Sequence, residues 1–267
     1  MTAMKKYWYI LLSSVALQVF AFIPESFCQV ENLGRVTVFK NSDTDKVLIE
    51  LIPVFNGKPL KLTNQYYINA HGDTLYIDAF RFYMANISFT GHRNALNTNS
   101  HLYDAADSDT YAFIIKNIPP GAYSNLQFTL GVDNIANTSG ANGGDLDPAK
   151  GMYWAWNSGY IMAKLEGRSK VCKTLHHAFQ FHIGGYMPPY NAARVVTLKL
   201  PASFTIGRSG IPCISLKVDV AAWFSGDFDL AKVNDIAVPG KEAAMMADKY
   251  AKMFSIDGVE FLRCSTQ

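Results

Sequence analysis

Apolar and polar residues alternate along most of the chain after residue 34, which is the pattern of strands that bury one face. Short segments with this alternation recur throughout, and glycine, proline and asparagine turns separate them. The predicted strands cover residues 35–39, 47–51, 66–69, 74–78, 81–90, 101–103, 111–115, 125–130, 153–166, 178–183, 194–200 and 214–220. This spacing predicts an all-β fold, a β-sandwich or a barrel-like single domain.

One segment near the C-terminus departs from the strand pattern. After the Pro-Gly pair at 239–240, apolar residues recur at helical spacing from Lys241 to about Phe254. We therefore expect one C-terminal amphipathic helix that packs on the sheet or caps an open end. Its methionines, Met245, Met246 and Met253, would suit a thioether copper site, but methionine at helical spacing usually fills gaps in a core. Packing is the favoured interpretation.

The stretch from Gly131 to Tyr160 joins a loop rich in Gly, Asn and Asp to an aromatic cluster. Glycine costs backbone entropy, and Asn and Asp side chains compete for backbone hydrogen bonds, so we expect its first half to be a long loop without helix or regular strand. Long loops of this kind in compact domains usually bind something. In its second half, Trp154 and Trp156 stand two residues apart, so on a strand both indoles share one face. They would then pack a core or line a site.

The same loop carries hard oxygen donors of the kind that calcium prefers. These donors are Asp133, Asn137, Asn142, Asp145 and Asp147, without the spacing of an EF-hand. Asn and Asp are also common in turns for backbone reasons, so a loop held by its own hydrogen bonds is favoured. Calcium in the 133–147 loop is kept as the alternative.

Composition places the chain among ordinary globular proteins, because 49% of its 267 residues are apolar and 17% are charged. The net charge of +2, with no cluster of Lys and Arg, argues against nucleic acid as a partner. The chain has no nucleophile elbow, phosphate-binding loop or metalloprotease helix. We therefore expect no enzyme activity and name no catalytic residue.

The N-terminus has the layout of a signal peptide. Lys5 and Lys6 precede an apolar run from Tyr7 to Ile23, and Pro24 follows. We expect a signal peptide over residues 1–28, cleaved after Cys28, and a periplasmic or secreted domain over residues 29–267. A membrane anchor is the competing interpretation, but polar residues interrupt the run, which falls short of the ~20 residues that a span requires. No stable span is expected after leader removal.

After cleavage, three cysteines remain, Cys172, Cys213 and Cys264. In an oxidising compartment one disulfide is expected and one thiol is left over. The connectivity cannot be deduced from the sequence. We slightly favour a bond between Cys172 and Cys213, because both flank predicted core strands.

Imidazole is the side chain that suits copper and zinc as a neutral nitrogen donor. The chain has six histidines, His71, His92, His101, His176, His177 and His182. His182 ends an apolar strand just before the pair Gly184 and Gly185, where it would either bind a metal or bond to a backbone carbonyl. His176 and His177 are adjacent and face opposite ways on a strand, so we interpret them as solvated loop residues, like His71 and His92.

Several short segments, in this order along the chain, resemble the MbnP-like copper-binding protein family. They are Gly-Val-Asp at 131–133, Leu-Asp-Pro at 146–148, Gly-Met-Tyr-Trp-Ala-Trp-Asn-Ser-Gly-Tyr-Ile at 151–161, Lys-Leu-Glu-Gly at 164–167 and Phe-His-Ile-Gly-Gly at 181–185. Tyr-Met-Ala-Asn-Ile at 83–87 and His-Leu-Tyr-Asp at 101–104 extend the resemblance.

The resemblance implies an exported copper-binding protein. In that family, copper is held by histidines and by a kynurenine, which a dihaem, MauG-like peroxidase partner makes from a tryptophan. The implied metal-binding residues are His101, His182 and either Trp154 or Trp156. Opening an indole ring yields an aniline nitrogen and a ketone, donors that the indole itself does not offer.

Two other functions are weighed against copper binding. One is a carbohydrate-binding or structural β-sandwich, in which the face of Trp154 and Trp156 stacks on sugar rings. The other is an enzyme that uses bound copper for redox chemistry, which comes last because the sequence indicates no base or substrate pocket.

Overall fold

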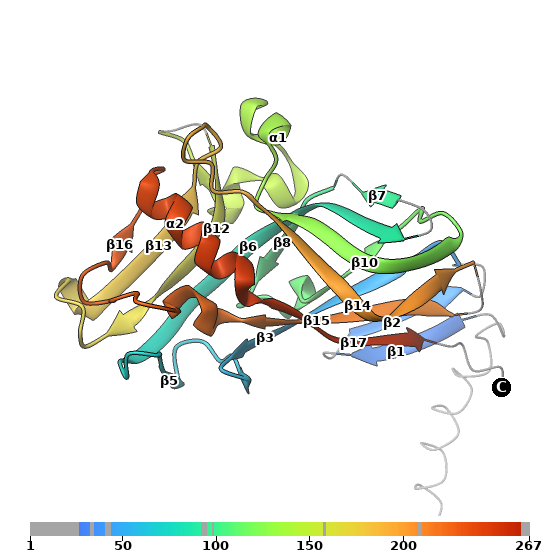
Figure 1. Cartoon of the computed structure of the whole chain (residues 1–267), viewed down its shortest axis with the longest axis horizontal. Helices are drawn as coiled ribbons and strands as arrows, with labels where there is room; N and C mark the ends of the chain where they lie inside the picture. Colours follow the sequence, from blue (N-terminus) through green and yellow to red (C-terminus); the bar gives the residue numbers. More distant parts are fainter. Residues whose placement is uncertain are drawn as a thin grey trace, which may run out of the picture.

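The computed structural model describes residues 27–32, 35–40, 44–91, 95–97, 99–156, 159–207 and 210–262. Two large sheets pack face to face, and a small ribbon of β1 (Phe27–Asn32) and β2 (Arg35–Lys40) lies beside them (Figure 1). The predicted all-β class, with a helix near the C-terminus, is confirmed. The expected leader falls mostly on residues 1–26, outside the described residues, and its cleavage stays a prediction. Among the described residues, no helix is long and apolar enough to cross a membrane.

The larger sheet is organised around one long strand, β6 (Thr74–Gly91). Along one edge, its first half pairs with β12 (Gly159–Ser169) and its second half with β10 (Gly121–Leu130). Strands joined by hydrogen bonds form the path β14 (Arg194–Ile206), β10, β6, β12, β13 (Ala178–Gly184) and β16 (Asp235–Ile236). Shorter strands join this path: β5 (Tyr66–Ile68), β7 (Ala95–Asn97) and β8 (His101–Asp104) on β6, and β11 (Tyr153–Trp154) on β12.

The smaller sheet brings together strands from early and late parts of the chain. Its order is β17 (Phe254–Leu262), β15 (Ile211–Asp219), β3 (Val47–Phe55) and β4 (Lys58–Pro59), with β9 (Ala112–Ile115) also on β3. The pairing of β15 with β3 is parallel, so a strand near the start of the fold depends on one near its end. The other large pairings within this sheet are antiparallel.

The core lies between the sheets and is dominated by aromatic rings. Phe82 stacks on Tyr103 at 4.7 Å between ring centroids and meets Phe254 of the smaller sheet edge-on at 5.5 Å. Where the smaller sheet does not reach, the larger sheet is covered by α2 (Lys241–Tyr250), which contacts β13 and η6 (Val220–Phe224) (Figure 1). Tyr250 of α2 stacks on the fully buried Trp223 at 4.5 Å.

Helix α2 confirms the predicted amphipathic helix, but it is shorter than expected. It ends at Tyr250, one turn of 3-10 helix follows as η7 (Ala251–Met253), and Phe254 already begins β17. Met246 and Met253 are buried in the core and Met245 is 54% exposed. The three methionines do not point to one place, as expected for packing residues.

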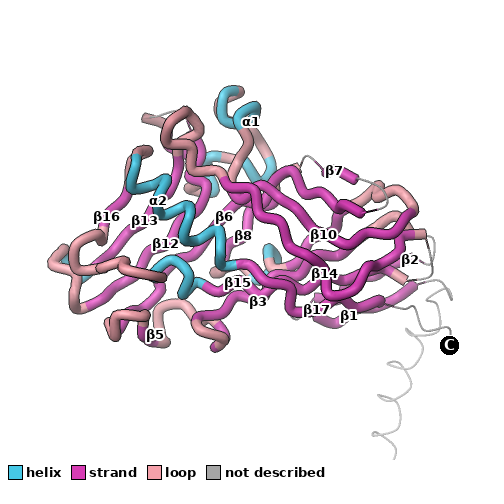
Figure 2. The backbone as a smooth tube through the Cα atoms, in the orientation of Figure 1, coloured by secondary structure: helices cyan, strands magenta, loops and turns pink. Residues whose placement is uncertain are grey.

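Helical turns are confined to connections between strands (Figure 2). The remaining ones are η2 (Ser108–Thr110), α1 (Asn134–Thr138), η3 (Gly144–Leu146), η4 (Pro148–Lys150) and η5 (Leu175–His177). The expectation that the first half of the 131–160 stretch holds no helix is wrong, since α1, η3 and η4 all lie there. Asp133 makes α1 stable by accepting a hydrogen bond from the amide of Ala136.

The favoured disulfide is also wrong. Cys172 and Cys213 are both buried and free, Cys172 in the turn after β12 of the larger sheet and Cys213 on β15 of the smaller one. Burial raises the pKa of each thiol to about 11. Both cysteines lie in or next to core strands and are therefore buried. The two strands, however, belong to different sheets. Cys264 lies outside the described residues.

Candidate functional site

His182 projects from the outer face of the larger sheet, away from the core. On β13, Phe179, Phe181 and Ile183 are buried in the core, and side chains alternate along a strand, so His182 faces the other way. Its side chain is 18% exposed. Nε2 of His182 lies 2.7 Å from Oε1 of Glu166 on the neighbouring strand β12.

Glu166 holds two basic neighbours with one oxygen. The ammonium nitrogen of Lys164, which stands directly opposite His182 in the strand register, lies 3.1 Å from the same Oε1. The hydrogen bond from His182 lowers the pKa of Glu166, partial burial opposes this, and Lys164 adds to the lowering, so the pKa is about 2. The carboxyl group is therefore ionised at neutral pH.

Trp154 lies on the same face of the sheet as His182. An added Cβ on Gly184 would come within 2.5 Å of Cζ3 of Trp154, which means that the indole rests directly on the backbone of Gly184. Gly184 is two residues after His182, so the two positions share the outer face with their Cα atoms ~7 Å apart. Trp154 is only 6% exposed.

Trp156 is 64% exposed and touches Trp154 from the solvent side. The ring centroids are 5.6 Å apart and the planes are inclined by 44°. The expected strand over 153–166 is interrupted: β11 ends at Trp154, a turn follows, and β12 begins at Gly159. The two indoles nevertheless meet, so the sequence correctly indicated a tryptophan pair although the strand is broken.

His101 lies at a different place, between the two sheets. Its ring stacks on Phe113 of β9 at 3.9 Å between centroids, and Nε2 donates to the carbonyl of Thr110 at 2.8 Å. Strands β8 and β13 are separated by β6 and β12, three strand spacings or ~14 Å. A coordinate bond to imidazole is about 2 Å long, so in this arrangement His101 and His182 do not serve one ion. The structure brings His182 and the two tryptophans to one face and leaves His101 apart.

The oxygen donors of the 133–147 loop bind mostly to the protein itself. Asp133 and Asp147 accept hydrogen bonds from amides at the starts of α1 and η4. Asp145 accepts from the amide of Leu102 at 3.1 Å and from the ammonium of Lys150 at 2.6 Å. This supports a loop held by its own hydrogen bonds, and the calcium alternative stays a prediction.

Asp145 also approaches His101, with 3.5 Å between Oδ2 and Nδ1. Partial burial raises the pKa of Asp145, but the contacts with His101, Lys150 and the amide of Leu102 outweigh it, so the pKa lies well below its usual range. Asp145 thus links the loop to β8, and its contact with His101 is part of that link.

The other described histidines are exposed, as expected. His71 and His176 lie at the surface, and His177 bonds through Nδ1 to the carbonyl of Cys172 at 2.9 Å. His92 lies outside the described residues. Across the parts of the chain that the structure describes, no group of three or more His, Cys, Asp or Glu side chains is arranged to hold a metal ion.

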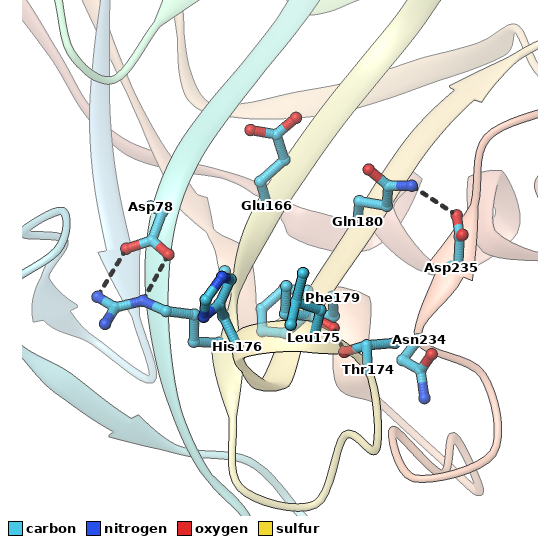
Figure 3. A pocket seen from close by; sticks show the side chains of 12 residues that line it. Asp78, Glu166, Thr174, Leu175, His176, Phe179, Gln180, Asn234 and Asp235 are labelled. Atoms are coloured by element: carbon cyan, nitrogen blue, oxygen red, sulfur yellow. Dashed lines mark hydrogen bonds and ion pairs between the residues drawn. The ribbon is translucent and has the colours of Figure 1, made fainter.

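A groove of about 510 Å³ runs along the outer face beside Glu166 (Figure 3). The ion pair of Arg168 with Asp78 and the hydrogen bond of Gln180 to Asp235, at 3.0 Å, lie on opposite sides of it. Because Glu166 lines this groove, the carboxylate that holds His182 can be reached from solvent.

Sequence reasoning missed Glu166, Lys164 and Gly184 as parts of this site. Lys164 and Glu166 alternate with the buried Ala163 and Leu165, which indicates an outward face. That signal could not show that His182 lies across from them, because strand register was unknown. Gly184 was noticed only as a place where another segment comes close, which is correct, since that segment carries Trp154.

Copper, which the resemblance implies, finds a partial donor set here. His182 offers an imidazole nitrogen, but an unmodified indole offers no lone pair. Of these residues only His182 supplies a metal donor in its unmodified form, so a copper centre at this place requires at least one further donor.

One family model matches this chain. The family model described as MbnP matches residues 44–244. Among solved structures, MbnP from Methylosinus trichosporium aligns with a TM-score of 0.46 and 14% sequence identity, over 73% of this chain and 82% of that chain. No curated protein matches.

Proposed function

This chain belongs to the MbnP family, whose model covers most of its length, and on that premise we propose that it is an exported copper-binding protein. Family membership associates the chain with copper. The proposed metal centre lies on the outer face of the larger sheet, at His182 and the neighbouring tryptophans. Its site of action is the periplasm or the exterior of the cell, and fractionation of the source cells tests this.

The proposed position of the metal centre rests on the contacts of His182 and Trp154. His182 is held by Glu166, with 2.7 Å between Nε2 and Oε1, and the indole of Trp154 rests on Gly184 two residues further along the same face. An imidazole held by a carboxylate is the usual arrangement of a histidine that binds a metal. His101 lies on the opposite face and, in this proposal, fastens β8 to its neighbours.

Between the two tryptophans, Trp154 is the proposed source of the additional ligand. Its indole lies on the face of His182 and is buried, so a donor formed there would be held in place, whereas Trp156 is largely exposed. A kynurenine at this position would supply an aniline nitrogen and a ketone. A dihaem peroxidase partner would carry out the oxidation, and peptide mapping by mass spectrometry of the protein from its own cells identifies the modified residue.

The test is a copper titration of His182→Ala beside the double variant His176→Ala/His177→Ala, each produced with the modifying partner. We expect His182→Ala to weaken copper binding by at least about 100-fold. This is the upper end of the effect of removing a hydrogen-bond partner of a ligand, and His182 is the proposed ligand itself. The double variant removes two exposed imidazoles and should bind like the wild type. Far-UV circular dichroism confirms the fold of each. Equal affinities for His182→Ala and wild type would remove His182 from the site.

The exposure of Trp156 favours a second candidate, a carbohydrate-binding β-sandwich. A largely exposed indole backed by a second one is a flat apolar platform that suits a sugar ring. Calorimetry with oligosaccharides separates the candidates. Sugar binding that is lost in Trp156→Ala, together with no copper binding by the modified protein, would favour this second function.

A further inference from the structure

We propose that Glu166 is a positioning residue that fixes the ring of His182 in one tautomer, with the hydrogen on Nε2 and the lone pair on Nδ1. The role of that lone pair as a metal ligand rests on the proposed function. The tautomer itself does not, because it follows from contacts within the protein.

The carboxylate of Glu166 sets the direction of its hydrogen bond with His182. An ionised carboxylate only accepts hydrogen bonds, so the ring nitrogen 2.7 Å from Oε1 of Glu166 must carry a hydrogen. That nitrogen is Nε2. In the neutral ring the lone pair is then on Nδ1, which has no hydrogen-bond partner among the described residues.

The carboxylate of Glu166 is itself held in place. Oε1 of Glu166 accepts from His182 and also contacts the ammonium of Lys164 at 3.1 Å, so both basic groups restrain one oxygen. Lys164 stands opposite His182 in the register and Glu166 stands opposite Gln180, so the contact runs diagonally between β12 and β13. Backbone hydrogen bonds already join these strands, which leaves ring orientation as the specific effect of the contact.

Glu166 also changes the net charge beside His182. A cation near His182 would be repelled by the ammonium of Lys164, but Glu166 neutralises that charge at contact distance. Glu166 therefore serves the site twice, by orienting the donor ring and by cancelling the nearest positive charge. Both effects act without direct contact between Glu166 and the metal.

The experiment compares Glu166→Ala and Glu166→Gln by NMR of the metal-free protein labelled with 15N in histidine. A glutamine oxygen can still accept from Nε2, although its amide can also donate to that nitrogen, so Glu166→Gln should keep a ring proton protected by a hydrogen bond but with a weaker preference for one tautomer. Glu166→Ala should lose that protection and give an averaged ring signal. Asp257→Ala, which breaks an exposed ion pair with Lys217 on the other sheet, is the control and should leave His182 unchanged.

Copper titration of the modified proteins supplies the second measurement. We expect Glu166→Ala to bind about 10-fold to 100-fold more weakly, as is usual when the partner of a ligating histidine is removed. Glu166→Gln should lose less affinity than Glu166→Ala, because it keeps a hydrogen-bond acceptor for Nε2 but no longer neutralises Lys164. Equal losses in both variants would mean that Glu166 acts as a ligand or through charge alone, and would overturn a positioning role.

The two hypotheses fail in different ways. If the ring signal of His182 is unchanged in Glu166→Ala, the positioning role of Glu166 is overturned, and the proposal of copper binding is unaffected. A locked ring in a modified wild-type protein that binds no copper overturns the proposed function and leaves the tautomer in place. If Glu166→Ala does not fold, Glu166→Leu, which fills a similar volume without an acceptor, gives the same test.

Discussion

Single carboxylate side chains link separate segments of the chain at two places in the larger sheet. Glu166 joins two basic side chains across neighbouring strands, and Asp145 joins the 131–160 stretch to β8. Each does so as an ionised carboxylate with a lowered pKa. Their effect on stability should therefore depend on pH in a defined direction.

The pKa of Glu166 is about 2 in the folded protein and about 4.3 in an unfolded chain. A lowered folded pKa gives stability that is present above the unfolded value and is lost as pH falls toward the folded value. We expect the free energy of unfolding to decline between pH ~4.5 and ~2, and to decline less in Glu166→Gln. Urea denaturation at several pH values measures this. A Glu166→Gln variant with the same decline as wild type would contradict it.

Gly184 supports a prediction on packing, because its missing side chain makes room for Trp154. A Cβ there would lie 2.5 Å from Cζ3 of the indole and 2.7 Å from the carbonyl oxygen of Tyr160. We expect Gly184→Ala to destabilise the fold by roughly 1–3 kcal/mol and to change tryptophan fluorescence. Gly258→Ala is the matched control, since it is also a strand glycine and nothing lies within 4 Å of its added Cβ. Equal stability of both variants would contradict the close approach.

At the level of elements, sequence patterns located most strands but not their ends. The strands predicted over 74–78 and 81–90 are one strand, β6, because a register shift opposite Glu166 and Gly167 lets it continue. Strand β17 was missed, since Phe254 fits the helical spacing of α2 although it begins a strand. Such boundaries are decided by pairing with distant segments, which alternation along one segment cannot show.

Pairing between distant segments also decided which parts of the candidate site could be predicted. The tryptophan pair and the glycine beside His182 could be recognised locally, since both depend on neighbours in sequence. The separation of His101 from His182 could not, because it depends on the order of β8, β6, β12 and β13 in the sheet.

Helix α2 allows a direct test of the packing role of its methionines. Met246 is buried against the core and Met245, the next residue, is 54% exposed. We expect Met246→Ala to cost about 2–5 kcal/mol of stability and Met245→Ala less than about 0.5 kcal/mol. Denaturant unfolding measures both. Neither variant should change copper affinity, and a loss of binding in either would revive a thioether site.

For the whole molecule, the two buried thiols report on the two sheets separately. Cys172 lies beside the larger sheet and Cys213 within the smaller one, and burial raises the pKa of both to about 11. A thiol reagent therefore reaches them only when the surrounding structure opens.

We expect both thiols to resist alkylation in the native protein and to share one labelling rate that rises with denaturant, because one core joins the sheets. Mass spectrometry of the two cysteine peptides measures this, with Ser255→Cys as an exposed reference. Earlier labelling of Cys213 would mean that the smaller sheet opens by itself.

The parallel pairing of β3 with β15 has a consequence for how the chain is made. Ser215 donates a hydrogen bond to Glu50, and the two residues are 165 positions apart in sequence. At a synthesis rate of roughly 5–20 residues per second, β3 leaves the ribosome about 10–30 s before its neighbour exists. During that interval the buried Ile49 and Leu51 lack their partners on β15, Ile214 and Leu216. We therefore expect the nascent chain to be prone to aggregation during that interval, and we expect a chaperone that recognises extended apolar segments to bind at β3.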